Sequence, residues 1–159
     1  MSIIEEKIVK AGFILPQLPP VAGLYSPAIR TGNLVFTSGQ LPLRNGILIE
    51  PGGSGKVNDA NMEEAAYASR VALLNGLAAI KSLTGTLSSI ERVVKLTLYV
   101  ASDHRFSRQH IVANGASSLL HELFEENWLH TRSAIGVAEL PLNASLELEL
   151  IVQCKFPVI

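Results

Sequence analysis

Apolar side chains fall on every second position near the end of the chain, which is the period of a β-strand. The clearest run is Leu146, Leu148, Leu150 and Val152, and residues 133–137 show the same alternation with smaller side chains. Between them, residues 140–143 read LPLN, which is turn chemistry. The pattern predicts two strands that this turn would join as a hairpin.

Strand alternation also assigns the two faces of this predicted hairpin. In the second strand the leucines point to a core, and the outward residues are Glu147, Glu149, Ile151 and Gln153. In the first strand we expect Ile135 and Val137 to point inward, leaving Arg132, Ala134, Gly136 and Ala138 outside. Small and apolar side chains suit a surface that another backbone approaches closely. The sequence therefore predicts a subunit interface on the outer face.

The rest of the chain carries strand and helix patterns in turn. Residues 2–12 fit a short amphipathic turn, and residues 24–29 and 34–38 fit a hairpin. Asn61 and Glu64 have capping-box spacing at the start of a helix that Gly85 ends. A strand follows at 90–101 and a second helix at about 106–125, with Asp103 as its expected cap. Helices that follow single strands predict a two-layer α+β sandwich with both helices on one face of the sheet.

The composition fits one domain. At 159 residues the chain can bury a core without disulfides or metals, and we divide it into an arm, residues 1–21, and a core, residues 22–155. A net charge of −1 gives no electrostatic reason to expect nucleic acid or an anionic membrane as a partner. Cys154 is the only cysteine, the start is acidic, and no apolar run approaches membrane-spanning length. We therefore expect a cytoplasmic protein.

Arg132 and Glu147 are the two best-placed opposite charges. A symmetric hairpin puts Arg132 opposite roughly Ile151, ~13 Å along the strand from the level of Glu147, so the two are not a cross-strand pair. A guanidinium is a planar fork for a carboxylate, and a carboxylate can act as a base. Meeting across an interface, they would form a small pocket for an anion and a water. An intersubunit salt bridge without a ligand is the alternative, and spacing alone favours it.

Other chemical patterns are weaker. The four histidines, His104, His110, His121 and His130, lack metal-site spacing within one chain, so we expect solvated histidines and no metal. Phe36 stands where a nucleophile elbow around Ser38 would need glycine. The glycine-rich residues 50–56 lack the spacing of a phosphate-binding loop.

Three segments together match a known pattern. The last comprises Arg132, Ser133, Val137, Leu140, Pro141, Glu147 and Glu149. Upstream, residues 32–42 read GNLVFTSGQLP, and Tyr25 shortly precedes them. Over about residues 22–155 the chain resembles the YjgF/RidA family of reactive intermediate deaminases, also called L-PSP proteins. The resemblance implies a chorismate-mutase-like fold with a mixed sheet, and a homotrimer whose sheets enclose a central barrel, with pockets between subunits.

The resemblance also implies a reaction, the hydrolysis of a small enamine or imine such as 2-aminoacrylate to a 2-keto acid and ammonia, without a cofactor. Arg132 would hold the substrate carboxylate and Glu147 a water. The other expected pocket residues are Tyr25, Ser38, Gly39, Ser133 and Ala134. Many members have proline two residues before the arginine and cysteine two after it, where this chain has His130 and Ala134. The substrate range is therefore open.

Two other functions remain open from the sequence. A non-catalytic trimer could use the same cleft to bind a small carboxylate as a sensor or regulatory protein. A ribonuclease would follow an older family name, but the near-neutral charge gives it no support.

Overall fold

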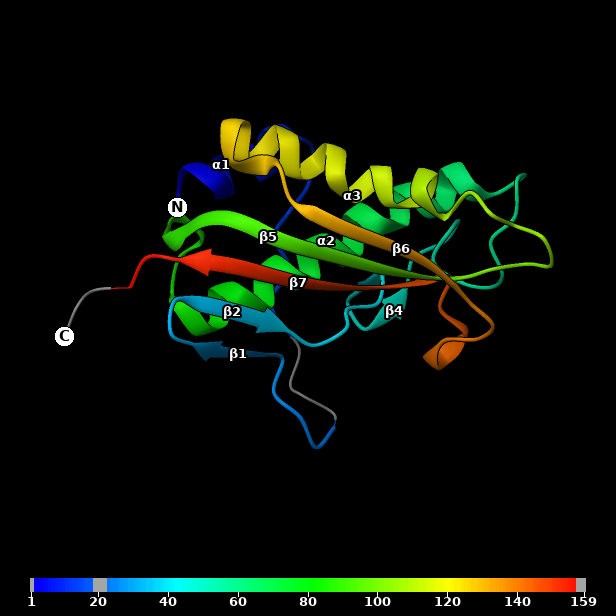
Figure 1. Cartoon of the computed structure of the whole chain (residues 1–159), viewed down its shortest axis with the longest axis horizontal. Helices are drawn as coiled ribbons and strands as arrows, with labels where there is room; N and C mark the ends of the chain where they lie inside the picture. Colours follow the sequence, from blue (N-terminus) through cyan, green and yellow to red (C-terminus); the bar gives the residue numbers. More distant parts are fainter. Residues whose placement is uncertain (1, 19–22, 157–159) are drawn as a thin grey trace.

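Five strands form one mixed sheet in the order β1-β2-β7-β5-β6, and two long helices cover one of its faces (Figure 1). The computed structural model describes residues 2–18 and 23–156. The strands of this sheet are β1 (Ala28–Thr31), β2 (Leu34–Thr37), β5 (Ile90–Ala101), β6 (Thr131–Val137) and β7 (Leu146–Cys154). The helices are α1 (Ile3–Lys10), α2 (Met62–Thr84) and α3 (Gln109–Phe124). The predicted two-layer α+β sandwich is confirmed, with α2 and α3 as its helical layer.

Short elements complete the chain. A separate two-stranded ribbon, β3 (Leu43–Arg44) and β4 (Ile47–Leu48), follows β2 and was not predicted. Three 3₁₀ turns, η1 (Leu87–Ser89), η2 (Glu125–Trp128) and η3 (Pro141–Asn143), lie between the main elements. No helix of the described residues is long and apolar enough to span a membrane.

The predicted hairpin near the end of the chain is wrong, because β5 lies between β6 and β7. β5 pairs in parallel with β6, with Leu96 opposite Arg132, and antiparallel with β7, with Tyr99 opposite Glu147. A strand, a crossover helix and a second strand form a parallel pair, and β5, α3 and β6 follow this rule. The turn residues 140–143 therefore connect two strands that do not touch.

The predicted faces of β6 are also reversed. In the parallel register Arg132, Ala134 and Gly136 share a face with the fully buried Leu96, Leu98 and Val100. Ile135, which we expected inside, is 41% exposed on the open face. Gly136 has a local reason: a Cβ here would lie 2.7 Å from Nε2 of Gln109, at the start of α3. The glycine therefore leaves room for a side chain of the same protein in its present position.

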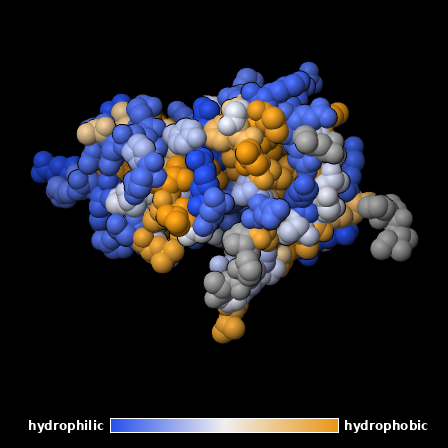
Figure 2. Space-filling view, turned by 180° about the vertical axis from the view of Figure 1, so that it is seen from behind, coloured by the Kyte–Doolittle hydropathy of each residue, from blue (hydrophilic) through white to orange (hydrophobic). Residues whose placement is uncertain are grey.

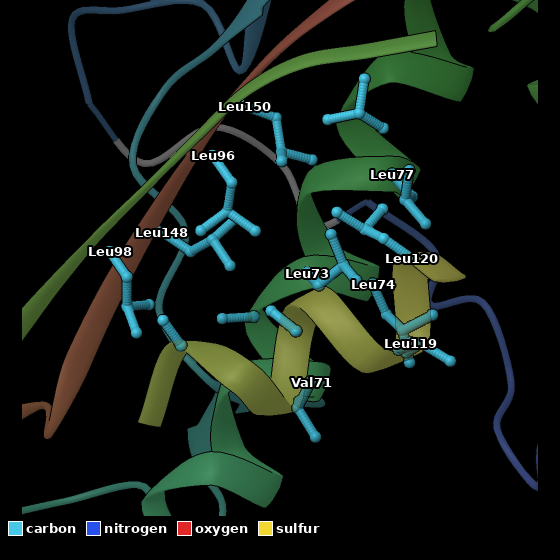
Figure 3. Close-up of a cluster of buried hydrophobic side chains, with 14 of the residues drawn as sticks. Val71, Leu73, Leu74, Leu77, Leu96, Leu98, Leu119, Leu120, Leu148 and Leu150 are labelled. Atoms are coloured by element: carbon cyan, nitrogen blue, oxygen red, sulfur yellow. The ribbon is translucent and has the colours of Figure 1, made fainter. Parts of the chain in front are cut away.

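The core lies between the sheet and the helices. Along β7 buried and half-buried residues alternate over the whole strand, as the sequence predicts. Figure 3 shows leucines of β5 and β7 pointing toward those of α2 and α3. The labelled side chains are Val71, Leu73, Leu74, Leu77, Leu96, Leu98, Leu119, Leu120, Leu148 and Leu150. The other sheet face carries Glu147, Glu149, Ile151 and Gln153, which confirms the faces predicted for β7.

Helix ends follow the sequence only in part. Gly85 ends α2 in the left-handed region with φ 79°, as predicted. The capping box is absent, because the Asn61 side chain accepts from the Asn58 amide at 2.8 Å and donates to the Lys56 carbonyl at 3.0 Å. α3 begins at Gln109 rather than 106, and the Asp103 carboxylate accepts from the adjacent His104 amide instead of capping it. In both places the side chain that could cap the helix instead makes hydrogen bonds to backbone groups of the loop before the helix.

The N-terminal segment begins with a true helix. Ser2 and Glu5 form a capping box at the start of α1, and Ile8 is fully buried. Of the predicted arm, residues 1 and 19–21 lie outside the described residues. The loop that leads into β1 projects below the sheet in Figure 1, and in Figure 2 the same projection ends in hydrophobic atoms. Leu24 in this loop is fully exposed and Tyr25 is 61% exposed.

The two long helices lie close together at Gly115. A Cβ on Gly115 would lie 2.6 Å from the carbonyl carbon of Ala66 and 2.6 Å from Oγ of Ser69. Ser69 itself donates to the Ala66 carbonyl and contacts the Val112 carbonyl, so the crossing is polar as well as tight. Glycine is therefore required by the crossing of α2 and α3 rather than by its own backbone angles.

Replacing Gly115 with alanine is expected to lower the free energy of unfolding by about 1–3 kcal/mol, because the new methyl group must push the α2 backbone away. Ser118→Ala, at an exposed position of the same helix, is the matched control and should change it by less than about 0.5 kcal/mol. Urea denaturation of both variants measures the difference. Equal stability of the two would contradict this account of the crossing.

Candidate functional site

Glu147 lies on the open face of β7, beside the segment that follows β2. Gln40 exchanges two backbone hydrogen bonds with Leu148, at 2.8 and 2.9 Å, which hold residues 38–40 against β7. A Cβ on Gly39 would lie 2.7 Å from Cδ of Glu147. Any side chain at position 39 would therefore push the Glu147 carboxylate out of its present position, so Gly39 and Glu147 are direct neighbours.

Ser38 ties this place to the loop before β1. Its hydroxyl donates to the Ser26 carbonyl at 2.6 Å, and its amide donates to the Pro27 carbonyl at 2.9 Å. Tyr25 precedes this contact and is exposed. The structure thus brings together three of the predicted site residues, Ser38, Gly39 and Glu147, and Tyr25 lies in the loop that contacts Ser38.

Two carboxylates share the open face of β7. Burial, and after it the nearby Glu149 carboxylate, raise the pKa of Glu147 above its ordinary value. The charge of Glu149 is also the main reason that the pKa of Tyr99 is raised. In the part of the chain that the structure describes, no Lys, Arg or His nitrogen lies within 4.0 Å of either carboxylate. Glu147 is therefore a half-buried acid without a counter-charge among residues 2–18 and 23–156.

Arg132 lies on the other face of the sheet. Its Nη1 donates to Oδ1 of Asn114 at 2.9 Å and to Oγ of Ser117 at 3.1 Å, and both partners belong to α3. Arg132 is nevertheless exposed, because β6 is the edge strand of the sheet. β5 separates it from β7, so a single chain does not bring Arg132 to Glu147.

The neighbours of Arg132 divide between the two faces. Ala134 packs against the core on the face of Arg132. Ser133 is opposite Thr97, which is itself opposite Glu149, so Ser133 lies on the open face. The expected pocket residues Arg132, Ser133 and Ala134 therefore do not share one face of the sheet within a single chain.

His130 is not a solvated histidine, contrary to expectation. Its Nδ1 lies 2.6 Å from the Trp128 carbonyl and its Nε2 lies 3.0 Å from Oγ of Ser117. Sequence reasoning therefore missed Asn114 and Ser117, which accept hydrogen bonds from Arg132, and the contact of Ser117 with His130. The one available signal was His130 itself, which departs from the pattern that the resemblance implies.

Two hollows of the described surface lie away from these residues. One of about 440 Å³ is lined by Arg92, Gln153 and Lys155 among others, and one of about 200 Å³ lies near Glu50 and Ser145. Neither is lined by Arg132 or Glu147. The candidate residues form two half-sites, an acidic one beside Gly39 and a cationic one on the edge strand.

Comparison with known proteins places the chain in a family. The family model described as Endoribonuclease L-PSP matches residues 16–154. Protein TCP17 of Trypanosoma cruzi is 34% identical over 148 residues, covering 91% of this chain and 89% of that protein. A 2-iminobutanoate/2-iminopropanoate deaminase of Dermatophagoides farinae is 28% identical over 137 residues, covering 86% of this chain and 91% of that protein.

A solved structure agrees over nearly the whole fold. The protein Atu1372 of Agrobacterium tumefaciens, of unknown function, superposes with a TM-score of 0.85 at 41% identity, covering 96% of this chain and 93% of that one. Agreement of the signature residues, the family match and this superposition leaves one conclusion. The chain belongs to the L-PSP family, also called the YjgF/RidA family.

Proposed function

We propose that this protein is an enamine/imine deaminase that hydrolyses small reactive intermediates, such as 2-aminoacrylate, to 2-keto acids and ammonia. The observation that carries the proposal is the pair of incomplete half-sites. Glu147 is a half-buried carboxylate without a cation among the described residues, and Arg132 presents a guanidinium at a free sheet edge. A relative named 2-iminobutanoate/2-iminopropanoate deaminase supports the same chemistry.

The proposed site is shared by neighbouring copies in a homotrimer. Arg132 of one copy would reach the Glu147 half-site of the next, since the two lie on opposite faces of one sheet. The open face fits this arrangement, because it carries the exposed apolar side chains Ile29 on β1 and Ile135 on β6, 58% and 41% exposed. The exposed Leu24 and Tyr25 at the projecting loop would lie at the same contact.

The mechanism needs one positioned ion pair and one group that transfers protons. Arg132 would grip the substrate carboxylate and place the imine carbon beside a water held by Glu147. The enamine first takes a proton from solvent at its terminal carbon, which gives the iminium. Glu147 takes a proton from the water as its oxygen bonds to the iminium carbon, which gives a neutral carbinolamine. Glu147 then returns this proton to nitrogen, and it takes the hydroxyl proton as the carbon–oxygen double bond forms and the carbon–nitrogen bond breaks, so that ammonia and the keto acid leave. The raised pKa of Glu147 suits both directions of this transfer.

Removing either group should slow the reaction in a different way. Arg132→Ala is expected to lower kcat/KM for freshly generated 2-aminoacrylate by about 100-fold or more, because the charge-assisted grip on the carboxylate is lost. Glu147→Gln should lower kcat with little change in KM. Arg108→Ala and Glu122→Gln, both at exposed positions of the helical layer, are the matched controls. Acceleration no greater than buffer by the wild-type protein would leave only the carboxylate-binding alternative, which Arg132-dependent binding of 2-ketobutyrate would identify.

A shared site predicts complementation. Mixing inactive Arg132→Ala and Glu147→Gln proteins under conditions of subunit exchange should restore activity, because some interfaces then combine an intact arginine with an intact glutamate. Native mass spectrometry should show three copies and hybrid assemblies. A stable monomer, or hybrids that form without any recovery of activity, would refute the shared cleft.

The pH dependence of kcat/KM should report the environment of Glu147. Its base form is lost as pH falls through its pKa, so the acid limb should lie above the pKa of an ordinary glutamate. Glu149→Gln removes the like charge and should move this limb to lower pH, whereas Glu122→Gln should not. If Glu149→Gln leaves the acid limb of kcat/KM in place, a group other than Glu147 causes that limb. The substrate is the same in all three proteins, so it cannot cause a difference between them.

A further inference from the structure

A chain of hydrogen bonds ties the Arg132 guanidinium to the body of the protein. Nη1 of Arg132 donates to Oγ of Ser117 at 3.1 Å, and Oγ lies 3.0 Å from Nε2 of His130. Nδ1 of His130 lies 2.6 Å from the Trp128 carbonyl. Ser117 is 7% exposed, so this chain runs from an exposed arginine into the protein.

The direction of each hydrogen bond follows from what each atom can do. The Trp128 carbonyl only accepts, so Nδ1 of His130 must carry a hydrogen. In the neutral ring Nε2 is then an acceptor, and the Ser117 hydroxyl donates to it. This leaves the Ser117 oxygen free to accept from Arg132. All three bonds are therefore satisfied together by the neutral Nδ1–H form of His130.

The same contacts decide which edge of the arginine is free. Nη1 carries two hydrogens, and Asn114 and Ser117 accept both of them. Within the described residues no hydrogen bond is made by Nε or Nη2 of Arg132. These two atoms form an edge whose parallel N–H groups match the two oxygens of a carboxylate.

We infer that Ser117 and His130 are positioning residues, which hold the guanidinium so that its Nε and Nη2 edge receives the substrate carboxylate. The identity of the ligand rests on the proposed function, but the arrangement of the arginine does not. A side chain held in place before binding loses less rotamer freedom when the ligand arrives, so affinity rises. His130 acts through Ser117, because without it the hydroxyl loses its acceptor and turns away from its present geometry.

A purely structural role is the competing explanation. The His130 ring packs edge-on against Trp128 at 6.1 Å between centroids, and this contact could serve only to hold η2. Such a role would change the stability of the protein without changing the affinity for a carboxylate. The two explanations therefore differ in KM and in the behaviour of the Arg132 side chain.

Steady-state kinetics on the full-length protein provide the first test. Ser117→Ala and His130→Ala are each expected to raise KM about 5- to 10-fold with kcat little changed, because the grip acts on substrate and transition state alike. The double variant should be no worse than either single one. His130→Gln keeps an acceptor near Ser117 and should recover much of the loss, while His110→Ala, exposed on α3, should have no effect. Unchanged KM in Ser117→Ala and His130→Ala would overturn the inference.

Side-chain ¹⁵N NMR of the free protein supplies a test that does not depend on turnover. In the wild type, the restrained Nη1 should exchange slowly with Nη2 and give separate signals for Arg132. Ser117→Ala and His130→Ala should speed this exchange, and His130→Gln should slow it again. Identical exchange in all four proteins would overturn the positioning role. If the wild type neither binds 2-ketobutyrate nor turns over 2-aminoacrylate, the proposed function fails, and the NMR comparison still decides the arrangement of the arginine.

Discussion

The insertion of β5 between β6 and β7 is the constraint on which the rest of the structure depends. It separates the two strands that carry the chemical groups by two strand spacings, ~10 Å. The register then turns Arg132 toward α3 and Glu147 toward the open face. The hydrogen-bonded pairing of the strands fixes both the distance between Arg132 and Glu147 and the faces on which they lie. Rotation of the two side chains therefore cannot bring them together. A site that contains both groups must therefore come from more than one copy.

The two half-sites are incomplete in complementary ways. Glu147 is half-buried beside Gly39, and its neighbour Glu149 adds a like charge, so its ionised form is disfavoured. Among the residues that the structure describes, Arg132 is held only by the neutral acceptors Asn114 and Ser117, which orient its charge without neutralising it. Removing a carboxylate from water is costly unless a partner compensates. An interface that brought the Arg132 guanidinium to Glu147 would supply that partner, and a substrate carboxylate would bind to the same guanidinium.

The sequence predicted what is local and missed what depends on distant partners. The leucine alternation of β7, the strand at 90–101 and the glycine stop of α2 were all correct, since each depends on neighbouring residues. The hairpin was wrong because a turn signal does not say which strand pairs with which. The face of β6 was wrong because a small residue such as Gly136 can leave room for a side chain of the same protein, here Gln109, as well as for another subunit. His130 was missed because its partner, Ser117, lies thirteen positions earlier on a helix.

The placement of the half-sites also limits the symmetry of the proposed assembly. In a twofold dimer the same patch meets itself, so both half-sites would have to lie within one contact surface. Here one lies under the helical layer at the β6 edge and the other on the open face near β2. The contact that joins them is therefore head-to-tail, and such contacts close as a ring or continue as a filament. A ring gives every copy one complete site, which makes a closed cyclic assembly the arrangement in which all arginines and glutamates are used.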